Sequence, residues 1–438
     1  MKTIMITAPS SNTGKTTLTL GIIRAIKDRG IDISAFKTGP DFIDTKYLGM
    51  AAGKSPGNLD MHLMGKEGIK NSISMNSGEY AVIEGAMGYF DGIYNTFENS
   101  SYDISKELNI PAILVYTPKG EMFSAIPKIK GIVEFEDSKV KGIILNKVDR
   151  SIFLLLKEKI EEYIDIKVLG YLPYDANLEI ESRYLGLMQG SESSDSEELI
   201  SKAAKAVEET IDIDAILELG KEIEVLPYKY GEKRNIKVSI AYDEALNFYY
   251  NENLKLLENI CEVEYFSPLK DKKVPDSDLI IFGGGYPELY GKELSENISM
   301  IDSIRKHVED EKHIIAEGGG FMYLGSSIED YKMVNIFNGK ATMTDKLQRF
   351  GYVDIILNKD TIIGKKDTVI PGNEYHRSVI DIDGTPVFDI KKPKSKRTWQ
   401  CGYISRNVIA YYQHINFLGN MESFNYLLDK IENNRKEG

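Results

Sequence analysis

The sequence predicts an α/β protein with two domains. In the first half, short apolar strands alternate with helical stretches, a pattern typical of a mostly parallel sheet covered by helices. A second strand and helix alternation begins at residue 236. A chain of 438 residues is also too long for one ordinary core. We expect a first domain at 1–190, a helical segment with a linker at 191–235, a second domain at 236–433 and a tail at 434–438.

Apolar runs define the expected strands. In the first domain they are 3–7, 33–37, 80–83, 112–116, 140–145 and 167–171. In the second domain they include 236–242, 278–282, 314–316 and 408–412, the last before a final helix. Because ligands of such sheets collect at the carboxyl ends of the strands, the segments that follow the first three strands should share one crevice.

The segment 8–17, Ala-Pro-Ser-Ser-Asn-Thr-Gly-Lys-Thr-Thr, follows the first strand and leads into a helical run at 18–29. Small residues there let backbone N–H groups close on a polyphosphate at a helix N-terminus, with Lys15 on the outer phosphates and Thr16 on Mg²⁺. Pro9 replaces the first glycine of the usual pattern, so the match is partial, and a chance match is the alternative. The candidate nucleotide-binding residues are Asn12, Thr13, Gly14, Lys15, Thr16 and Thr17. ATP or GTP is the expected ligand.

Carboxylates follow two further strands. Asp41 and Asp44 come after the second strand, beyond a Gly-Pro turn, and Glu84 ends the strand at 80–83 in a Walker-B-like position. Because Mg²⁺ in phosphoryl-transfer sites is held by hard oxygen ligands, the expected metal set is Thr16, Asp41 and Glu84. Asp44 is expected to face the substrate. The alternative is that these acids only stabilise turns or helix ends.

Asn146 opens the sequence Asn-Lys-Val-Asp, which superficially matches a base-reading element. It is a candidate contact for adenine, and a surface turn is the alternative.

Composition limits the classes of partner. The net charge of −13 argues against nucleic acid, and the 42% hydrophobic content contains no apolar run long enough to cross a membrane. The strand that follows Met1 and Lys2 leaves no room for a cleavable leader. The two cysteines, Cys261 and Cys401, support neither a disulfide framework nor a thiolate metal cluster. We expect a soluble, cytoplasmic protein.

Several motifs resemble one known family. Phe-Lys-Thr-Gly-Pro-Asp-Phe-Ile-Asp at 36–44, Gly-Asn-Leu-Asp at 57–60 and the segment 84–92 resemble the synthetase domain of cobyrinate a,c-diamide synthases, in the dethiobiotin-synthetase-like group. The segments 241–250, 266–269, 283–289 and 316–324 are similar to that family's class I glutamine amidotransferase domain. The resemblance covers nearly the whole chain and depends on the order and spacing of many motifs.

The resemblance implies an amidation that uses ATP and Mg²⁺. The substrate would be cobyrinic acid or a close tetrapyrrole, activated at its a and c carboxylates as acyl phosphates, with glutamine as the nitrogen donor. Asp44 and Asp91 match family acids near the reacting centre, and Phe42 and Ile43 match positions beside the macrocycle. Arg183 matches a family arginine that can pair with a substrate carboxylate or a phosphate; a structural salt bridge is the alternative. A homo-oligomer is compatible with this resemblance.

The expected glutaminase nucleophile is missing. The family pattern Ala-Glu-Cys-Gly-Gly reads Ala-Glu-Gly-Gly-Gly at 316–320, and Gly318 has no side chain with which to attack an amide. His414 matches the catalytic histidine but has no thiol to activate there, so a structural role is its alternative. His376 matches a second family histidine, expected in packing or substrate contact, and neither cysteine lies on an elbow-like turn. Three explanations stand: use of free ammonia, a domain that only binds substrate or partner, or a change introduced at Gly318.

The competing hypothesis is a P-loop ATPase that forms no amide and binds a tetrapyrrole or a protein as a switch or carrier. Retention of the acids Asp41, Asp44, Glu84 and Asp91 favours the enzyme, because a binding module would not need the whole set.

Overall fold

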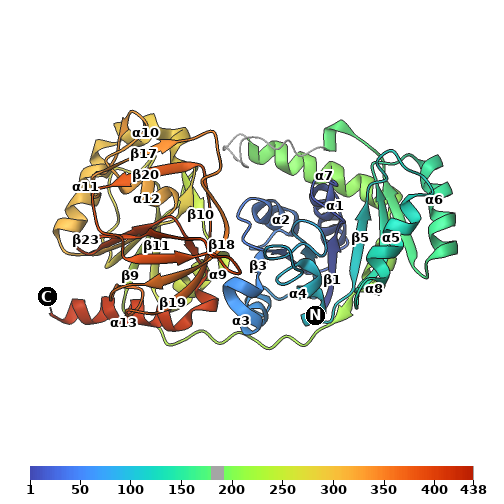
Figure 1. The fold of residues 1–438 in the computed structure, drawn as a ribbon, viewed down its shortest axis with the longest axis horizontal. Coiled ribbons are helices and arrows are strands. Elements are labelled where there is room, and N and C mark those ends of the chain that lie inside the picture. Colours follow the sequence, from blue (N-terminus) through green and yellow to red (C-terminus); the bar gives the residue numbers. More distant parts are fainter. Residues whose placement is uncertain (179–191, 438) are drawn as a thin grey trace. The chain divides into compact units, whose positions relative to one another are not determined.

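The computed structural model describes residues 1–178 and 192–437, which form two compact units. The first unit takes residues 1–61 and 65–228, and the second takes 62–64 and the chain from Lys229 onward. Each contains a largely parallel sheet with helices packed against it (Figure 1). The predicted α/β class is confirmed.

The sheet of the first unit has the order β3-β2-β4-β1-β5-β6-β7, all parallel, with β8 paired antiparallel to β1. Its strands are β1 (Lys2–Thr7), β2 (Ile33–Thr38), β3 (Gly57–Leu59), β4 (Tyr80–Glu84), β5 (Ala112–Tyr116), β6 (Val140–Asn146), β7 (Lys167–Leu172) and β8 (Lys221–Glu222). The strands β2, β4 and β5 are buried along their whole length. This explains their nearly continuous apolar sequences, since a parallel strand covered on both faces has no solvent side.

The helices of this unit are α1 (Lys15–Asp28), α2 (Asp44–Ala52), α3 (Met61–Met75), α4 (Ser101–Glu107), α5 (Ala125–Glu134), α6 (Arg150–Tyr163), α7 (Glu192–Thr210) and α8 (Ile213–Leu219). Several begin at a side chain that accepts a backbone N–H: Ser100 for α4, Asp149 for α6 and Asp212 for α8. Asp149, from the Asn-Lys-Val-Asp sequence, is thus a helix cap.

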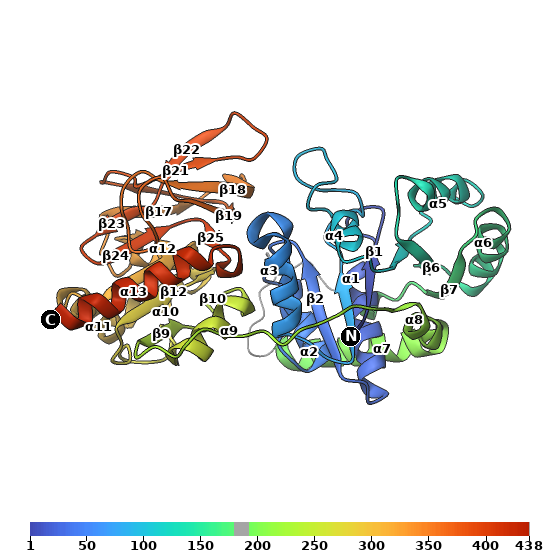
Figure 2. The same cartoon turned by 90° about the horizontal axis from the view of Figure 1, so that it is seen from below.

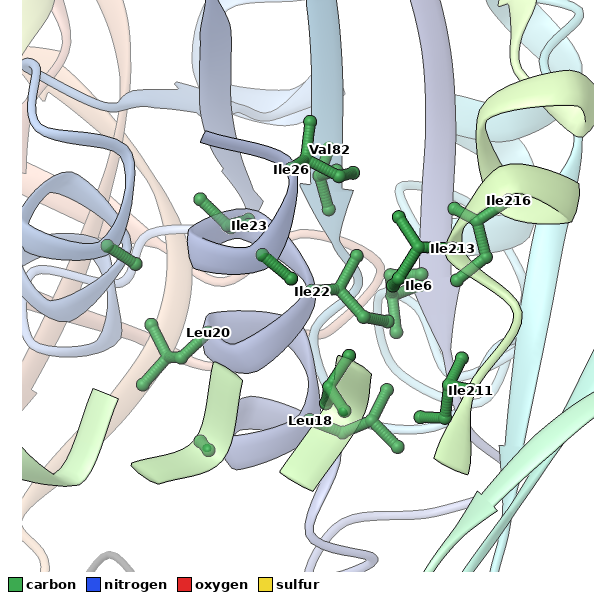
Figure 3. Close-up of a cluster of buried hydrophobic side chains, with 14 of the residues drawn as sticks. Ile6, Leu18, Leu20, Ile22, Ile23, Ile26, Val82, Ile211, Ile213 and Ile216 are labelled. Atoms are coloured by element: carbon green, nitrogen blue, oxygen red, sulfur yellow. The ribbon is translucent and has the colours of Figure 1, made fainter. Parts of the chain in front are cut away.

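One large apolar core joins α1 to the sheet and to the helical segment that follows it. Leu18 and Ile22 of α1 meet Ile6 of β1, together with Ile211 and Ile213 (Figure 3). The expected helical segment at 191–235 is therefore divided, because its part from 192 to 222 belongs to the first unit. The chain then runs without regular structure from β8 to residue 237. The boundary between the two units falls in this segment of the sequence, between Tyr228 and Lys229.

The second unit is built on a sheet of order β11-β9-β12-β14-β24-β23, parallel except for β23. These strands are β9 (Lys237–Ala241), β11 (Glu262–Phe266), β12 (Leu279–Phe282), β14 (His313–Glu317), β23 (Tyr403–Ser405) and β24 (Val408–Tyr411). Its helices are α9 (Asn251–Ile260), α10 (Gly291–Glu296), α11 (Ile298–Glu309), α12 (Gly319–Leu324) and α13 (Met421–Glu437).

The second unit also has a largely antiparallel region, most of it between α12 and β24 in the sequence, that the expected strand and helix alternation did not include. One sheet has the order β22-β21-β18-β19-β25, another β16-β15-β17-β20, and β10 pairs with β13. The strands are β10 (Leu246–Phe248), β13 (Gly284–Gly285), β15 (Ser327–Ile328), β16 (Tyr331–Lys332), β17 (Gly339–Met343), β18 (Arg349–Leu357), β19 (Val369–His376), β20 (Ser378–Ile382), β21 (Phe388–Lys391), β22 (Thr398–Cys401) and β25 (His414–Ile415). The hairpin of β21 and β22 projects from this unit (Figure 2).

Candidate functional site

The phosphate loop joins β1 to α1 in the first unit. Gly14 caps α1 with a left-handed φ of 75°, and a Cβ there would lie 2.5 Å from the side-chain amide nitrogen of Asn146. That amide donates a 2.6 Å hydrogen bond to the carbonyl of Thr13, which also accepts one from Thr117 at 3.1 Å. Only glycine therefore fits at position 14, and Asn146 holds the loop in shape.

The start of α1 presents groups suited to phosphate. The N–H groups of a helix's first turn have no partner within the helix, and the helix dipole favours an anion there. The Lys15 ammonium donates to the carbonyl of Met87 at 3.0 Å. Burial lowers the pKa of Lys15 to about 8, although the negative charge of Glu84 opposes the change. Thr17 is turned inward, where its hydroxyl donates to the carbonyl of Leu178 at 3.0 Å.

A buried charge cluster lies beneath this loop. The hydroxyl of Thr16 donates to Oε1 of Glu84 at 2.7 Å. The ammonium of Lys37 donates to the same oxygen at 2.8 Å and to Asp44 at 2.7 Å, and it lies 3.9 Å from Asp41. The carboxyl ends of β2 and β4 are adjacent in the sheet, and this brings the cluster together.

The charges within the cluster determine its protonation. Burial by itself lowers the pKa of Lys37, but Glu84, Asp44 and Asp41 outweigh that effect and raise it above its ordinary value. Burial would raise the pKa of Asp44, yet the ion pair with Lys37 lowers it. Burial and the charge of Asp44 raise the pKa of Asp41 to about 6. Lys37 is therefore a fixed cation and Asp44 a fixed anion at neutral pH.

The donor set fits a small divalent cation in part. Glu84 is fully buried, and among the described residues its Oε2 has no hydrogen-bond partner. That oxygen and the adjacent Thr16 hydroxyl are the hard oxygen donors that Mg²⁺ prefers. Asp41 is less well placed, because its Oδ1 accepts the N–H groups of Ile43 and Asp44 at 2.9 Å each, just before α2. Within 1–178 and 192–437, no group of three or more His, Cys, Asp or Glu side chains is arranged for a metal.

A strained turn joins β14 to α12 in the second unit. Gly318 has φ 49° and ψ −108° and caps α12, and its N–H donates to the carbonyl of Tyr411 at 2.8 Å. A Cβ at this position would lie 2.9 Å from Cε1 and 3.1 Å from Nε2 of His414. The turn thus has the sharp strand-to-helix form of a nucleophile elbow and directs position 318 at the histidine.

His414 is held by its neighbours. Its Nδ1 lies 3.3 Å from Oε2 of Glu317, and the other oxygen of Glu317 accepts bonds from the Tyr411 hydroxyl at 3.3 Å and the Ile415 N–H at 3.4 Å. This leaves Nε2 facing Gly318. The arrangement orients an imidazole toward a position that carries no side chain.

Neither cysteine can replace the missing thiol. Burial raises the pKa of Cys261 to about 12 and that of Cys401 to about 11, so both stay as thiols. His376 packs face to face on Tyr412, with ring centroids 3.8 Å apart, and burial lowers its pKa to about 4. It is a packing residue in this structure.

Known proteins share this arrangement of domains. Residues 4–187 match the CobQ/CobB/MinD/ParA nucleotide binding domain, and residues 237–421 match the CobB/CobQ-like glutamine amidotransferase domain. Cobyrinate a,c-diamide synthase of Clostridium tetani is 40% identical over 98% of this chain and all of its own. The enzyme of the same name from Clostridium acetobutylicum is 39% identical over 98% of this chain and all of its own.

The chain belongs to the cobyrinate a,c-diamide synthase family. It is accordingly an enzyme of the ligase class, with a P-loop nucleotide-binding domain and a glutamine amidotransferase domain. Among the described residues, no helix is both long enough and apolar enough to cross a membrane.

Other residues expected at the family's synthetase site lie on the segments that follow β1, β2 and β4. Asp91 is exposed, and its carboxylate accepts the Gly88 N–H at 3.1 Å within a turn. Asn12 is exposed on the phosphate loop, whereas Phe42 and Ile43 are half-buried between β2 and α2. Arg183 lies outside the described residues.

The alternative of a surface turn at Asn146 is wrong, because this residue is buried at the end of β6. Two residues that the structure brings into these clusters were not singled out from the sequence. Lys37 is the centre of the charge cluster, and Glu317 orients His414. A lysine at the end of an otherwise apolar strand was the available signal for Lys37, since a buried ammonium requires carboxylate partners.

Proposed function

We propose that this protein amidates the a and c carboxylates of cobyrinic acid, or of a close tetrapyrrole, at the expense of ATP. The observation that carries the proposal is the convergence of Thr16, Lys37 and Glu84 beneath the phosphate loop. A module that only binds nucleotide has no use for a buried cation with two further carboxylates beside it. The name shared by relatives that are 40% and 39% identical, cobyrinate a,c-diamide synthase, supports the choice of substrate.

The reaction has two steps. A carboxylate oxygen of the substrate forms a bond to the γ-phosphorus of ATP while the bond to the β,γ-bridging oxygen breaks and ADP leaves. The nitrogen of ammonia then bonds to the acyl carbon, the bond to the phosphate oxygen breaks, and inorganic phosphate leaves as a proton passes to solvent. Catalysis of phosphoryl transfer is mainly positioning and charge stabilisation.

The chain's residues divide this work. The loop residues Thr13 to Thr16 bind the phosphates with their N–H groups, and Lys15 turns from the Met87 carbonyl to the outer phosphates. Lys37 supplies positive charge at the transferring group and is held there by Asp44. Thr16 and Glu84 would hold Mg²⁺, with Asp41 adding charge, and the ion neutralises phosphate charge when bound.

The remaining expected contacts form part of the same proposal. Asp91 would act from the loop after β4, Phe42 and Ile43 would lie against the macrocycle, and Asn146 would contact the nucleotide while it shapes the loop. Arg183 would pair with a carboxylate.

We further propose that the nitrogen comes from free ammonia. Gly318 cannot form the thioester through which a glutaminase releases ammonia, and the shifted pKa values of Cys261 and Cys401 leave no thiolate to replace it. His414 and Glu317 then have no nucleophile to serve.

The test incubates the protein with ATP, Mg²⁺ and cobyrinic acid, with glutamine or ammonium in parallel, and follows the diamide by mass spectrometry. We expect product with ammonium only. Lys15→Gln should abolish it, whereas Lys141→Gln, at an exposed position of β6, should not. Product with glutamine would overturn the assignment of ammonia. ATP binding without product from either source would support the switch instead.

A further inference from the structure

The antiparallel region of the second unit contains a cavity of about 500 Å³ that the proposed mechanism does not use. It lies where β18 begins and where β21 turns into β22. We call it the cationic pocket. Its lining includes Gln348, Arg349, Phe350, Lys392, Arg397 and Trp399.

Three cations line the cationic pocket, and among the described residues none of them forms an ion pair. The ammonium of Lys392 donates to the carbonyl of Phe350, and Arg349 donates to the carbonyl of Gln348 at 2.9 Å. Burial lowers the pKa of Lys392, and the charges of Arg397 and Arg349 lower it further against the opposing charge of Glu374. Like charges held together without a counterion favour binding of an anion.

Flat aromatic faces lie between these charges. The guanidinium of Arg349 lies 4.8 Å from the centroid of the Trp399 ring, and the ammonium of Lys392 lies 6.0 Å from that of Phe350. Phe350 is 56% exposed, although it belongs to a strand. The pocket therefore offers both apolar stacking surface and positive charge.

The backbone of β18 is shaped to fit this arrangement. Gly351 has φ 95°, and a Cβ there would meet the Lys392 nitrogen at 3.4 Å. The glycine lets the lysine lie across the strand instead of extending into solvent. Glu374, whose charge acts on Lys392, is buried and accepts a hydrogen bond from Gln413.

A ligand that matches the cationic pocket is flat and apolar in its body and carries several carboxylates on its edge. Two comparison ligands each have one of these properties: citrate has carboxylates without a flat body, and a fully esterified macrocycle has the flat body without charge. We propose that this pocket binds one carboxylate-bearing edge of the tetrapyrrole substrate and so anchors the substrate on the second unit. The identity of the ligand rests on the proposed function.

Trp399 provides the readout because it is the only tryptophan in the chain. We would follow its fluorescence while titrating the full-length protein, without ATP, with cobyrinic acid, with the heptamethyl ester of the same macrocycle, and with citrate. Calorimetry would run in parallel, since a corrin bound elsewhere can also quench by energy transfer. The acid should bind saturably, whereas the ester and citrate should bind at least tenfold more weakly.

The decisive variant is the double change Lys392→Gln with Arg397→Gln. Loss of two charge-assisted contacts should weaken cobyrinic acid binding by roughly tenfold or more. Lys391→Gln is the matched control, because this exposed lysine precedes Lys392 and does not line the pocket. Circular dichroism would check that each variant is folded, and Lys392→Arg should restore binding.

The outcomes separate this proposal from the proposed function. Amidation by the wild type, with equal affinity for cobyrinic acid in the double variant and in Lys391→Gln, would overturn the cationic pocket and leave the function standing. Charge-dependent binding of cobyrinic acid at these residues without amidation would support the pocket and overturn the function. An RNA oligonucleotide would be titrated in the same way. If the double variant bound this RNA more weakly than the wild type but bound cobyrinic acid equally well, the face would be a nucleic-acid surface and the proposal would be overturned.

Discussion

Restoring a thiol at position 318 tests the interpretation of the second unit. A side chain at φ 49° and ψ −108° is strained, at about 1–3 kcal/mol. The new Cβ would also lie 2.9 Å from Cε1 of His414, so the imidazole must move by a few tenths of an ångström. We expect Gly318→Cys to lower the free energy of unfolding by about 1–3 kcal/mol. Gly318→Ala should lower it by a similar amount, since both variants carry the strain.

The two variants should differ in chemistry. A cysteine thiol beside Nε2 of His414 can lose its proton to the imidazole, and the thiolate can attack the amide carbon of glutamine. We expect Gly318→Cys to release glutamate from glutamine and Gly318→Ala to release none. Adding His414→Gln to the cysteine variant should reduce the rate by about 10²–10⁴-fold, the usual contribution of a positioned base.

Glutamate release would be measured by a coupled enzymatic assay, and folding by denaturant titration. Alkylation of the new thiol would show that it is accessible, because Cys261 and Cys401 should react slowly as buried or half-buried thiols. A folded Gly318→Cys protein whose thiol is alkylated but which releases no glutamate would refute the reasoning. Equal stability of wild type, Gly318→Cys and Gly318→Ala would refute the strain argument.

Three further predictions follow from the structure. Gly14→Ala should weaken ATP binding at least tenfold in calorimetry, because its Cβ would meet the Asn146 side chain at 2.5 Å. The control Gly120→Ala has a similar φ of 70° and no atom within 4 Å of the new Cβ, so it should leave the affinity for ATP unchanged. Equal effects of the two changes would contradict the steric argument. Lys37→Met should abolish amidation and reduce the free energy of unfolding by about 3–5 kcal/mol, since it leaves the carboxylates of Asp44 and Glu84 without their cation. An unchanged free energy of unfolding in denaturant titration would disprove the ion-pair network. Burial lowers the pKa of His307 to about 4, so its contribution to the free energy of unfolding is complete above the unfolded pKa near 6.5 and is lost as the pH falls toward 4. Relative to His307→Gln, the wild type should lose about 3 kcal/mol of unfolding free energy between pH 7 and pH 4. A difference between the two proteins that stays constant with pH would refute the pKa shift.

Much of the first unit could be predicted because its strands are buried on both faces. The expected strand at 112–116 has the bounds of β5, and the expected ends of the other strands differ from the observed ends by one residue. The convergence of the segments that follow β1, β2 and β4 was also predicted, since ligand-binding segments of a parallel sheet gather at the carboxyl ends of its strands. Continuous apolar runs gave a strong signal in this half.

The antiparallel region could not be predicted in the same way. In β18 the burial alternates only in its second half, and its first residues are exposed because they line the cationic pocket. Strands with two or three residues, such as β15 and β23, carry no periodicity at all. The helices α7 and α8 were assigned to a separate segment because their charged outer faces resemble a linker. Their apolar faces pack on α1, a tertiary contact that composition does not encode.

The pairing of β8 with β1 has a consequence for how this fold can be combined with others. Met1 and Ile223 exchange backbone hydrogen bonds of 3.0 Å in both directions, so the chain leaves the first unit beside the point where that unit begins. A domain whose entry and exit are adjacent can be inserted, fused or permuted without breaking its sheet. A different partner domain could therefore be joined after residue 228 without interrupting the pairing of β1 with β8.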